Sequence, residues 1–206
     1  MKSNSDRKPV AILGSGPAGL MAADIAASAG YPVQIFEKKK GPGRKLLIAG
    51  SSGLNVTYDD TQENFHTHYL GPEGRFEKIL KAFPPSSWLE YLDQLGMKTF
   101  KGTSRRYFIE GLKASTLLHA WLTSLQKKGA EIFYQHECDG FETTPSHGVR
   151  LRFTNGKEME CAAACFCLGG GSYEESESPL RWPGIFLKKD LRFHPFRASN
   201  VGFQVD

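Results

Sequence analysis

Apolar runs and a glycine-rich break alternate along the first forty residues of the chain. Residues 9–13 form a short apolar run that ends abruptly at a glycine-rich stretch, 14–19, and residues 17–29 then carry Ala, Leu and Met at helical spacing. Gly30 ends this pattern, and a second apolar run follows at 31–37. Two short apolar runs on either side of a helical segment predict a βαβ unit with parallel strands and a right-handed crossover.

The middle of the chain is patterned for helices. Residues 38–57 predict a loop, because glycine and serine recur there, and residues 58–72 are polar and turn-rich. Three later segments carry apolar residues every three or four positions, which predicts helices over 73–83, 84–96 and 113–128. We expect this helical excursion, about 60–128, to interrupt the regular alternation of strands and helices.

Short strand-like runs make up most of the remainder. Residues 97–108 predict a hairpin or irregular strands, and residues 130–137 predict a single strand. Residues 148–171 predict a hairpin that turns at an Asn-Gly pair, followed by an apolar strand that breaks on three glycines. The end of the chain is turn-rich, apart from a strand-like run at 200–206.

The charge balance is mild, because the 206 residues carry a formal net charge of +4. A chain of this length suits one core with a small attached subdomain. Its basic residues are scattered except at 38–40 and at Arg44 and Lys45, which favours phosphate recognition at one site over a nucleic-acid partner. No run of about eighteen apolar residues is present, so we expect no membrane span or membrane partner.

The four cysteines favour buried structural thiols over a metal site. Three of them lie in the apolar run CAAACFC at 161–167, where free cysteine behaves as a small hydrophobe. The sequence has no CxxC pair, and His66 and His68 lack further ligands at suitable spacing, so we assign no metal. Reduced thiols of this kind are typical of a cytoplasmic protein.

The stretch GSGPAG at 14–19 carries the GxGxxG pattern, and Glu37 ends the second predicted strand. This order is typical of dinucleotide-binding folds. The first glycine permits the tight turn, the second lets the backbone approach a pyrophosphate, and the third lets the helix pack against the strand. The acidic residue can accept hydrogen bonds from a ribose and would repel a 2′-phosphate. The binding candidates of this unit are Gly14, Gly16, Pro17, Ala18, Gly19, Glu37 and Lys38.

The order of elements after the βαβ unit distinguishes FAD from NAD. Strands and helices alternate regularly in NAD-dependent dehydrogenases, whereas here a basic loop, a helical excursion and a β-meander intervene. The order therefore favours an α/β, Rossmann-like FAD-binding domain of the glutathione-reductase type. The resemblance to that type implies that Arg44 contacts the diphosphate and ribose region, that the backbone of Cys138 contacts the adenine edge, and that Gly169 and Gly170 pack against the cofactor.

A closer family resemblance runs along essentially the whole chain. The chain resembles the bacterial flavoproteins labelled as NAD(P)/FAD-dependent oxidoreductases, which are related to aminoacetone oxidase and BaiN-like proteins. The motifs that carry the resemblance are AILGSGPAGLMAA, GRKLLIAGSSGLNVT, AFPPSSWLEYLDQLGMKTFKGTSRRYF, LKASTLLHAWL and CLGGGSY.

One loop departs from the better-known members of this family. Their loop reads SGGGRCN, whereas residues 49–55 read AGSSGLN, without the arginine and the cysteine. The chain therefore resembles a less characterised subfamily. The resemblance implies that Arg44, Lys45 and the loop from Gly50 to Asn55 run past the ribityl chain and the flavin ring.

Members of this family are longer than this chain. They continue into a substrate-facing β domain and a C-terminal segment that closes over the flavin. We therefore expect residues 1–206 to form the FAD/NAD(P)-binding domain, without the substrate domain and the closing segment, and we expect a homo-oligomer or a missing C-terminal half.

The resemblance implies an oxidoreductase in which hydride passes from a small-molecule substrate to FAD, with NAD(P)H as a further electron donor. The substrate and the catalytic residues are unknown from the sequence, and Ser51 and Ser52 have no His or Asp partners at the spacing of a hydrolase triad.

Two alternative functions stay open at this point. One is a non-catalytic module or fragment that binds an adenine dinucleotide, and the other is an NAD-dependent dehydrogenase.

Overall fold

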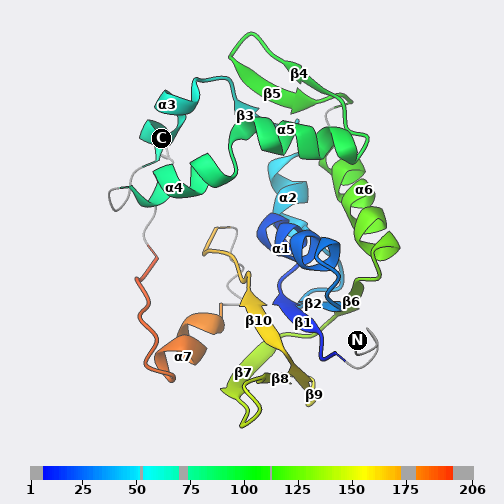
Figure 1. The fold of residues 1–206 in the computed structure, drawn as a ribbon, viewed down its shortest axis with the longest axis vertical. Helices are drawn as coiled ribbons and strands as arrows, with labels where there is room; N and C mark the ends of the chain where they lie inside the picture. Colours follow the sequence, from blue (N-terminus) through cyan, green and yellow to red (C-terminus); the bar gives the residue numbers. More distant parts are fainter. Residues whose placement is uncertain (1–6, 52, 70–73, 112, 173–179, 197–206) are drawn as a thin grey trace, which may run out of the picture. The chain divides into compact units, whose positions relative to one another are not determined.

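The computed structural model of the chain describes residues 7–51, 53–69, 74–111, 113–172 and 180–196 (Figure 1). The chain forms two compact units. The first unit consists of residues 1–42 and 129–206, and the second consists of residues 43–128.

A four-stranded parallel sheet forms the centre of the first unit. Its order is β10-β1-β2-β6, with β10 at Ala163–Phe166, β1 at Val10–Leu13, β2 at Val33–Glu37 and β6 at Glu131–Tyr134. Helix α1, Pro17–Ser28, connects β1 to β2. The predicted α/β fold with a parallel βαβ unit is therefore confirmed.

Both faces of this parallel sheet are covered, which explains why its strands are almost entirely apolar. Successive residues of β1 point to opposite faces. Ile12 faces α1, close to Gly19, whereas Ala11 and Leu13 pack into a core shared with the second sheet of the unit. That sheet is antiparallel, in the order β7-β8-β9, and its strands are Cys138–Thr143, Val149–Phe153 and Glu158–Cys161. It confirms the predicted hairpin within 148–171.

The second unit combines helices with a small antiparallel sheet in the order β3-β5-β4. Trp121 lies at the centre of this unit and is 1% exposed. The centroid of its ring lies 5.6 Å from that of Trp88 and 5.5 Å from that of Tyr91. Its elements are α2 Arg44–Ala49, β3 Asn55–Tyr58, α3 Gln62–Phe65, a 3-10 turn His66–His68, α4 Arg75–Ala82, α5 Pro85–Gln94, β4 Thr99–Lys101, β5 Arg106–Ile109 and α6 Ala114–Lys127. The three predicted helices and the predicted hairpin of this region are confirmed.

Three expectations about local structure are wrong. The segment expected to be a loop, 38–57, contains α2 and the start of β3, and the polar segment 58–72 contains α3. The turn-rich tail contains α7, Trp182–Leu187. The residues of α2, RKLLIA, favour a helix. The segment is only six residues long and has a glycine at each end, so its helical pattern is too short to be recognised from the sequence. The strand-like run at 200–206 lies outside the described residues.

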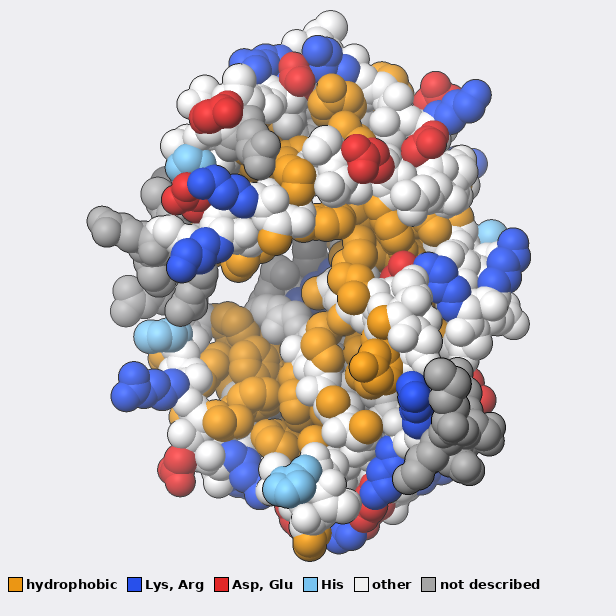
Figure 2. All heavy atoms as spheres, viewed as in Figure 1, with side chains coloured by type: hydrophobic (Ala, Val, Ile, Leu, Met, Phe, Trp, Pro, Cys, Tyr) orange, Lys and Arg blue, Asp and Glu red, His pale blue; other side chains and the backbone are white. Residues whose placement is uncertain are grey.

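Helix α7 contributes to an aromatic cluster in the first unit. Phe186 lies 5.8 Å from Phe141 of β7 and 5.3 Å from Phe166 of β10, between ring centroids, and Trp182 lies 5.4 Å from Phe186. Apolar side chains gather in Figure 2 over the region that α7 occupies in Figure 1. These contacts supply the tertiary packing that a six-residue helix needs.

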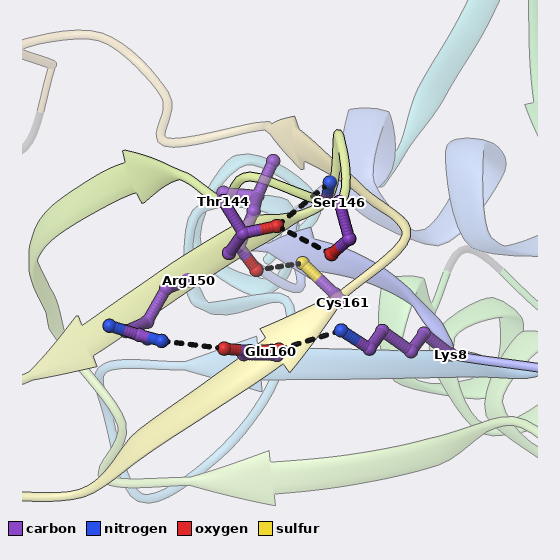
Figure 3. Close-up of polar contacts among 8 residues, drawn as sticks. Lys8, Thr144, Ser146, Arg150, Glu160 and Cys161 are labelled. Atoms are coloured by element: carbon purple, nitrogen blue, oxygen red, sulfur yellow. Dashed lines mark hydrogen bonds and ion pairs between the residues drawn. The ribbon is translucent and has the colours of Figure 1, made fainter.

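A three-residue ion-pair network connects Lys8, which precedes β1, to Arg150 and Glu160 of the antiparallel sheet (Figure 3). The Lys8 ammonium donates to one carboxylate oxygen of Glu160 at 2.6 Å, and the Arg150 guanidinium donates to the other at 2.7 Å. These two hydrogen bonds lower the pKa of Glu160 from 4.5 to about 2. The ionised form of Glu160 is therefore favoured by folding.

This shift predicts how stability depends on acid. Because the folded-state pKa is depressed, the contribution of Glu160 is fully present above about pH 4.5 and is lost as the pH falls from there towards 2. We expect Glu160→Gln to reduce the urea midpoint at pH 7 and to converge with the wild type at pH 2. Glu158→Gln, which removes a carboxylate from the same strand, is the control. A difference between Glu160→Gln and the wild type that is the same at pH 7 and pH 2 would contradict the assignment.

Candidate dinucleotide site

The turn between β1 and α1 depends on glycine at position 14. Gly14 has φ +105, which L side chains rarely adopt, and its amide donates to the carbonyl of Phe36 at 2.8 Å. A Cβ at this position would overlap the carbonyl oxygen of Cys167, which follows β10. The turn is thus fixed between two neighbouring strands.

The two later glycines of the motif have different surroundings. A Cβ on Gly19 would overlap the carbonyl oxygen of Gly14, so Gly19 allows α1 to begin directly against the turn. Gly16 is the N-cap of α1, and apart from Gly16 itself and its two chain neighbours no described atom lies within 4 Å of the position that its Cβ would take. Open space over Gly16 is what a diphosphate needs if it is to approach the backbone closely.

The N-terminus of α1 suits an anion. The N-cap residue, Gly16, has no side chain that could cap the helix. Pro17 occupies the first turn, where its missing N–H costs nothing. The first-turn amides of a helix lack intrahelical partners, and the helix dipole adds positive charge at the same end. The turn and the helix therefore offer amide donors to a phosphate group.

Glu37 is the last residue of β2 and is bonded directly to the glycine turn. One of its carboxylate oxygens accepts from the Ser15 amide at 3.1 Å and from the Ser15 hydroxyl, and the other accepts from the Lys39 amide at 2.9 Å. A carboxylate has about four lone-pair sites, so it retains acceptor capacity for a ribose hydroxyl. Lys38, between two residues of this network, is half-buried.

The carboxyl ends of β1, β2 and β10 lie at one edge of the parallel sheet. The chain leaves β1 through α1 towards β2, whereas β10 pairs on the opposite side of β1, so the strand order reverses there. Ligands of open α/β sheets bind outside the carboxyl ends at such a reversal. Gly169, with φ +73, and Gly170 follow β10 at this edge.

Ser15, Lys39 and the backbone of Cys167 were not identified from the sequence. Ser15 is fully buried although it is the variable residue between the first two glycines. Its position within the motif was the available signal, whereas the Lys39 amide and the Cys167 carbonyl become recognisable only in the folded chain.

Four of the predicted site residues belong to the second unit. Arg44 and Lys45 form the first turn of α2, Gly50 is its C-cap, and Asn55 begins β3. Arg44 and Asn55 are exposed, whereas Gly50 is buried. Their contacts with a cofactor stay predictions.

Cys138 belongs to the antiparallel sheet of the first unit and not to the parallel sheet. The predicted strand, β6, ends at Tyr134, and Cys138 begins β7. The side chain is buried, its thiol donates to the carbonyl of Gly140 at 3.4 Å, and burial raises the pKa of the thiol. Contact of its backbone with adenine stays a prediction.

The expectation that all the cysteines are buried is wrong for two of them. Cys138 and Cys161 are buried, but Cys165 and Cys167 are each partly exposed, because they lie at the end of β10. Among the described residues, no three His, Cys, Asp or Glu side chains are grouped so that they could hold a metal ion. The helices in the described ranges are all too short or too polar to cross a bilayer.

Comparison with known proteins identifies similar sequences and folds. A family model described as "HI0933-like protein Rossmann domain" matches residues 8–195. The curated ribosomal RNA dihydrouridine synthase of Haemophilus influenzae is 26% identical over 164 residues, which are 77% of this chain and 39% of that protein. The chain therefore matches about two fifths of the length of this relative.

Among solved structures, the 3-ketosteroid-delta4-(5alpha)-dehydrogenase from Rhodococcus jostii RHA1 has a TM-score of 0.57 at 20% identity, over 82% of this chain and 47% of that one. The THI4 protein of Thermovibrio ammonificans has a TM-score of 0.49 at 19% identity, over 77% of this chain and 55% of that one. The first of these similarities supports the same fold class.

Proposed function

The chain belongs to the family of HI0933-like Rossmann domains, and from this premise we propose that it binds FAD as the cofactor domain of a flavin-dependent oxidoreductase. The membership confirms the resemblance to BaiN-like flavoproteins that the sequence motifs indicated. It also supports a flavin cofactor in place of NAD alone. The substrate that we propose is a small molecule that exchanges hydride with the flavin.

The observation that carries this proposal is the joined arrangement of the glycine turn, the α1 N-terminus and Glu37. Open space over Gly16 admits the diphosphate, and the first turn of α1 supplies amide donors. The Glu37 carboxylate is held at the carboxyl end of β2 by Ser15 and Lys39, and it accepts hydrogen bonds from the hydroxyls of the adenosine ribose. Its negative charge disfavours a 2′-phosphate at the same position.

Residues from other segments complete the proposed site. The glycine pair after β10, Gly169 and Gly170, has no side chains and lets the backbone approach the cofactor. We propose, as the family resemblance implies, that Arg44 and Lys45 bring positive charge to the diphosphate. The proposed electron donor is NAD(P)H. When bound, FAD supplies the redox chemistry, while the protein supplies position and electrostatics.

Cofactor uptake tests the proposal directly. The purified chain is mixed with FAD, passed through a desalting column and examined for visible flavin absorbance. We expect about one flavin per chain to remain with the protein. A folded, colourless protein after this treatment would overturn the proposal. Uptake of NAD⁺ under the same conditions without uptake of FAD would favour an NAD-dependent dehydrogenase instead.

Removing the guanidinium of Arg44 tests the contribution of the second unit. We expect Arg44→Ala to raise the FAD dissociation constant by about tenfold, because a charge-assisted contact with a phosphate is lost. Lys98→Ala removes one positive charge from the same unit and serves as the matched control. Equal dissociation constants for the two variants, measured by quenching of flavin fluorescence, would remove Arg44 from the site.

A second candidate substrate is a uridine in ribosomal RNA. The observation that favours it is the 26% identity to a protein named ribosomal RNA dihydrouridine synthase. Dihydrouridine is uridine with its ring double bond reduced, so hydride would pass from the cofactor to the substrate. This direction is opposite to the one that we expected from the sequence, and the substrate is a nucleic acid.

Nucleoside analysis separates the two candidates. The FAD-loaded chain is incubated with NADPH and with ribosomal RNA transcribed in vitro, and the digested RNA is examined by mass spectrometry. Dihydrouridine above the level in a sample with Gly16→Ala would support the RNA substrate. Its absence from a sample in which the chain retains FAD would contradict that candidate for this chain and would leave the FAD proposal intact.

A further inference from the structure

Two cysteine side chains lie together at the end of β10. Cys165 is paired in register with Ile12 of β1, and Cys167 follows two residues later. Residues two apart in a strand point to the same face. The two sulfur atoms are 3.6 Å apart, and each residue is partly exposed.

The two thiols of this pair are not equivalent. Burial, followed by a hydrogen bond to Cys165, raises the pKa of Cys167 to about 12. Cys167 therefore keeps its proton at physiological pH, and a hydrogen bond in which either thiol can be the donor joins the two sulfur atoms. Burial disfavours the Cys167 thiolate, so we assign Cys165 as the sulfur that peroxide attacks and Cys167 as the resolving thiol.

The backbone of Cys167 is part of the glycine turn. Its amide donates to the carbonyl of Leu13 at 2.8 Å, and its carbonyl oxygen fills the space beside Gly14 that a Cβ would need. No side chain separates these two backbone segments. A displacement of Cys167 therefore moves the residue that starts the turn.

A bond between the two sulfurs favours such a displacement. The sulfurs must approach from 3.6 Å to about 2 Å, the length of a disulfide. Residues two apart in an extended strand have Cα atoms about 6.6 Å apart, which is close to the upper end of the range found for disulfides. The commonest separation in disulfides is about 5.5–6 Å, so the bond draws the end of β10 together and moves the Cys167 backbone with it.

We propose that Cys165 and Cys167 form a peroxide-sensitive dithiol, and that their oxidation to an intrachain disulfide disturbs the Gly14 turn and weakens cofactor binding. The last step rests on the proposed function. The Cys165 thiolate attacks hydrogen peroxide, gives a sulfenic acid and releases hydroxide. The Cys167 sulfur then displaces hydroxide from the Cys165 sulfur, the S–S bond forms, and the Cys167 proton passes to the released hydroxide to give water. The two thiols lose two electrons and two protons, and the peroxide becomes two molecules of water.

Mass spectrometry tests the covalent step independently of any cofactor. The native chain is treated with hydrogen peroxide and digested without reduction. We expect the peptide that holds Cys165 and Cys167 to lose two hydrogen atoms, and we expect Cys138 and Cys161 to remain thiols because they are buried. In Cys167→Ser we expect a sulfenic acid on Cys165 that reacts with dimedone. Oxidation of Cys138 or Cys161 ahead of this pair would overturn the proposal.

Cofactor affinity tests the coupling to the turn. We expect the FAD dissociation constant of the oxidised chain to rise by about tenfold and to recover after treatment with dithiothreitol. Cys165→Ser cannot form the bond, so its affinity is expected to be unaffected by peroxide. A disulfide that forms without any change in FAD affinity would overturn the coupling. If the reduced chain binds no FAD, the proposed function fails, while the mass measurement still decides whether the dithiol is oxidised.

Discussion

Gly14→Ala is expected to destabilise the first unit by about 2–4 kcal/mol and to abolish FAD binding. Two effects add at this position. The backbone has φ +105, and the new Cβ would overlap the carbonyl oxygen of Cys167. That carbonyl belongs to backbone bonded to β1, so it cannot rotate away as a flexible side chain would. Urea unfolding followed by circular dichroism measures the loss of stability.

Gly16→Ala is the matched variant that separates folding from binding. Its backbone has φ −74, which alanine adopts readily, and apart from residue 16 itself and its two chain neighbours no described atom lies within 4 Å of the new methyl group. We expect a change in stability below about 1 kcal/mol. The FAD dissociation constant should nevertheless rise by at least about tenfold, because the methyl group occupies the space that the diphosphate needs. Wild-type affinity in Gly16→Ala would exclude this turn as the diphosphate site.

Glu37→Gln is expected to weaken FAD binding by about 1–3 kcal/mol, because the amide keeps the shape of the carboxylate but loses its charge and one acceptor. The control is Ser15→Ala, which removes only the hydroxyl that donates a hydrogen bond to Glu37. We expect this variant to retain FAD affinity, because the Ser15 amide and the Lys39 amide still hold the carboxylate. Titration with FAD, monitored by flavin fluorescence, compares the two. Equal losses in both variants would mean that Glu37 acts only by holding the turn.

The parallel core could be predicted because its signals are local. Short apolar runs, the helical spacing of 17–29 and the stop at Gly30 indicated β1, α1 and β2 without knowledge of any distant contact. The hairpin of β8 and β9 followed from one Asn-Gly turn. Helix α2 was missed because its N-cap is Gly43, whose φ of +63 places the backbone against Leu118 of α6. Such support from a segment far away in the sequence has no local pattern.

The candidate site divides in the same way. The positions of Gly14, Gly16, Gly19 and Glu37 could be predicted, since the motif ties each residue to a particular backbone position. The closure of the turn by Cys167 could not be predicted, because it depends on the pairing of β10 with β1, about 150 residues apart along the chain. The partial exposure of Cys165 and Cys167 was missed for a related reason. An apolar run predicts burial but does not show where the strand ends.

The β1–α1 turn and Glu37 together form the proposed FAD site. Calorimetric titration of the purified chain with FAD, with Gly16→Ala examined in parallel, measures binding at this site. We expect saturable binding of about one FAD per wild-type chain, and affinity at least about tenfold weaker in the folded variant. The absence of saturable binding to a folded wild-type chain, or equal affinity in the two proteins, would contradict this proposal.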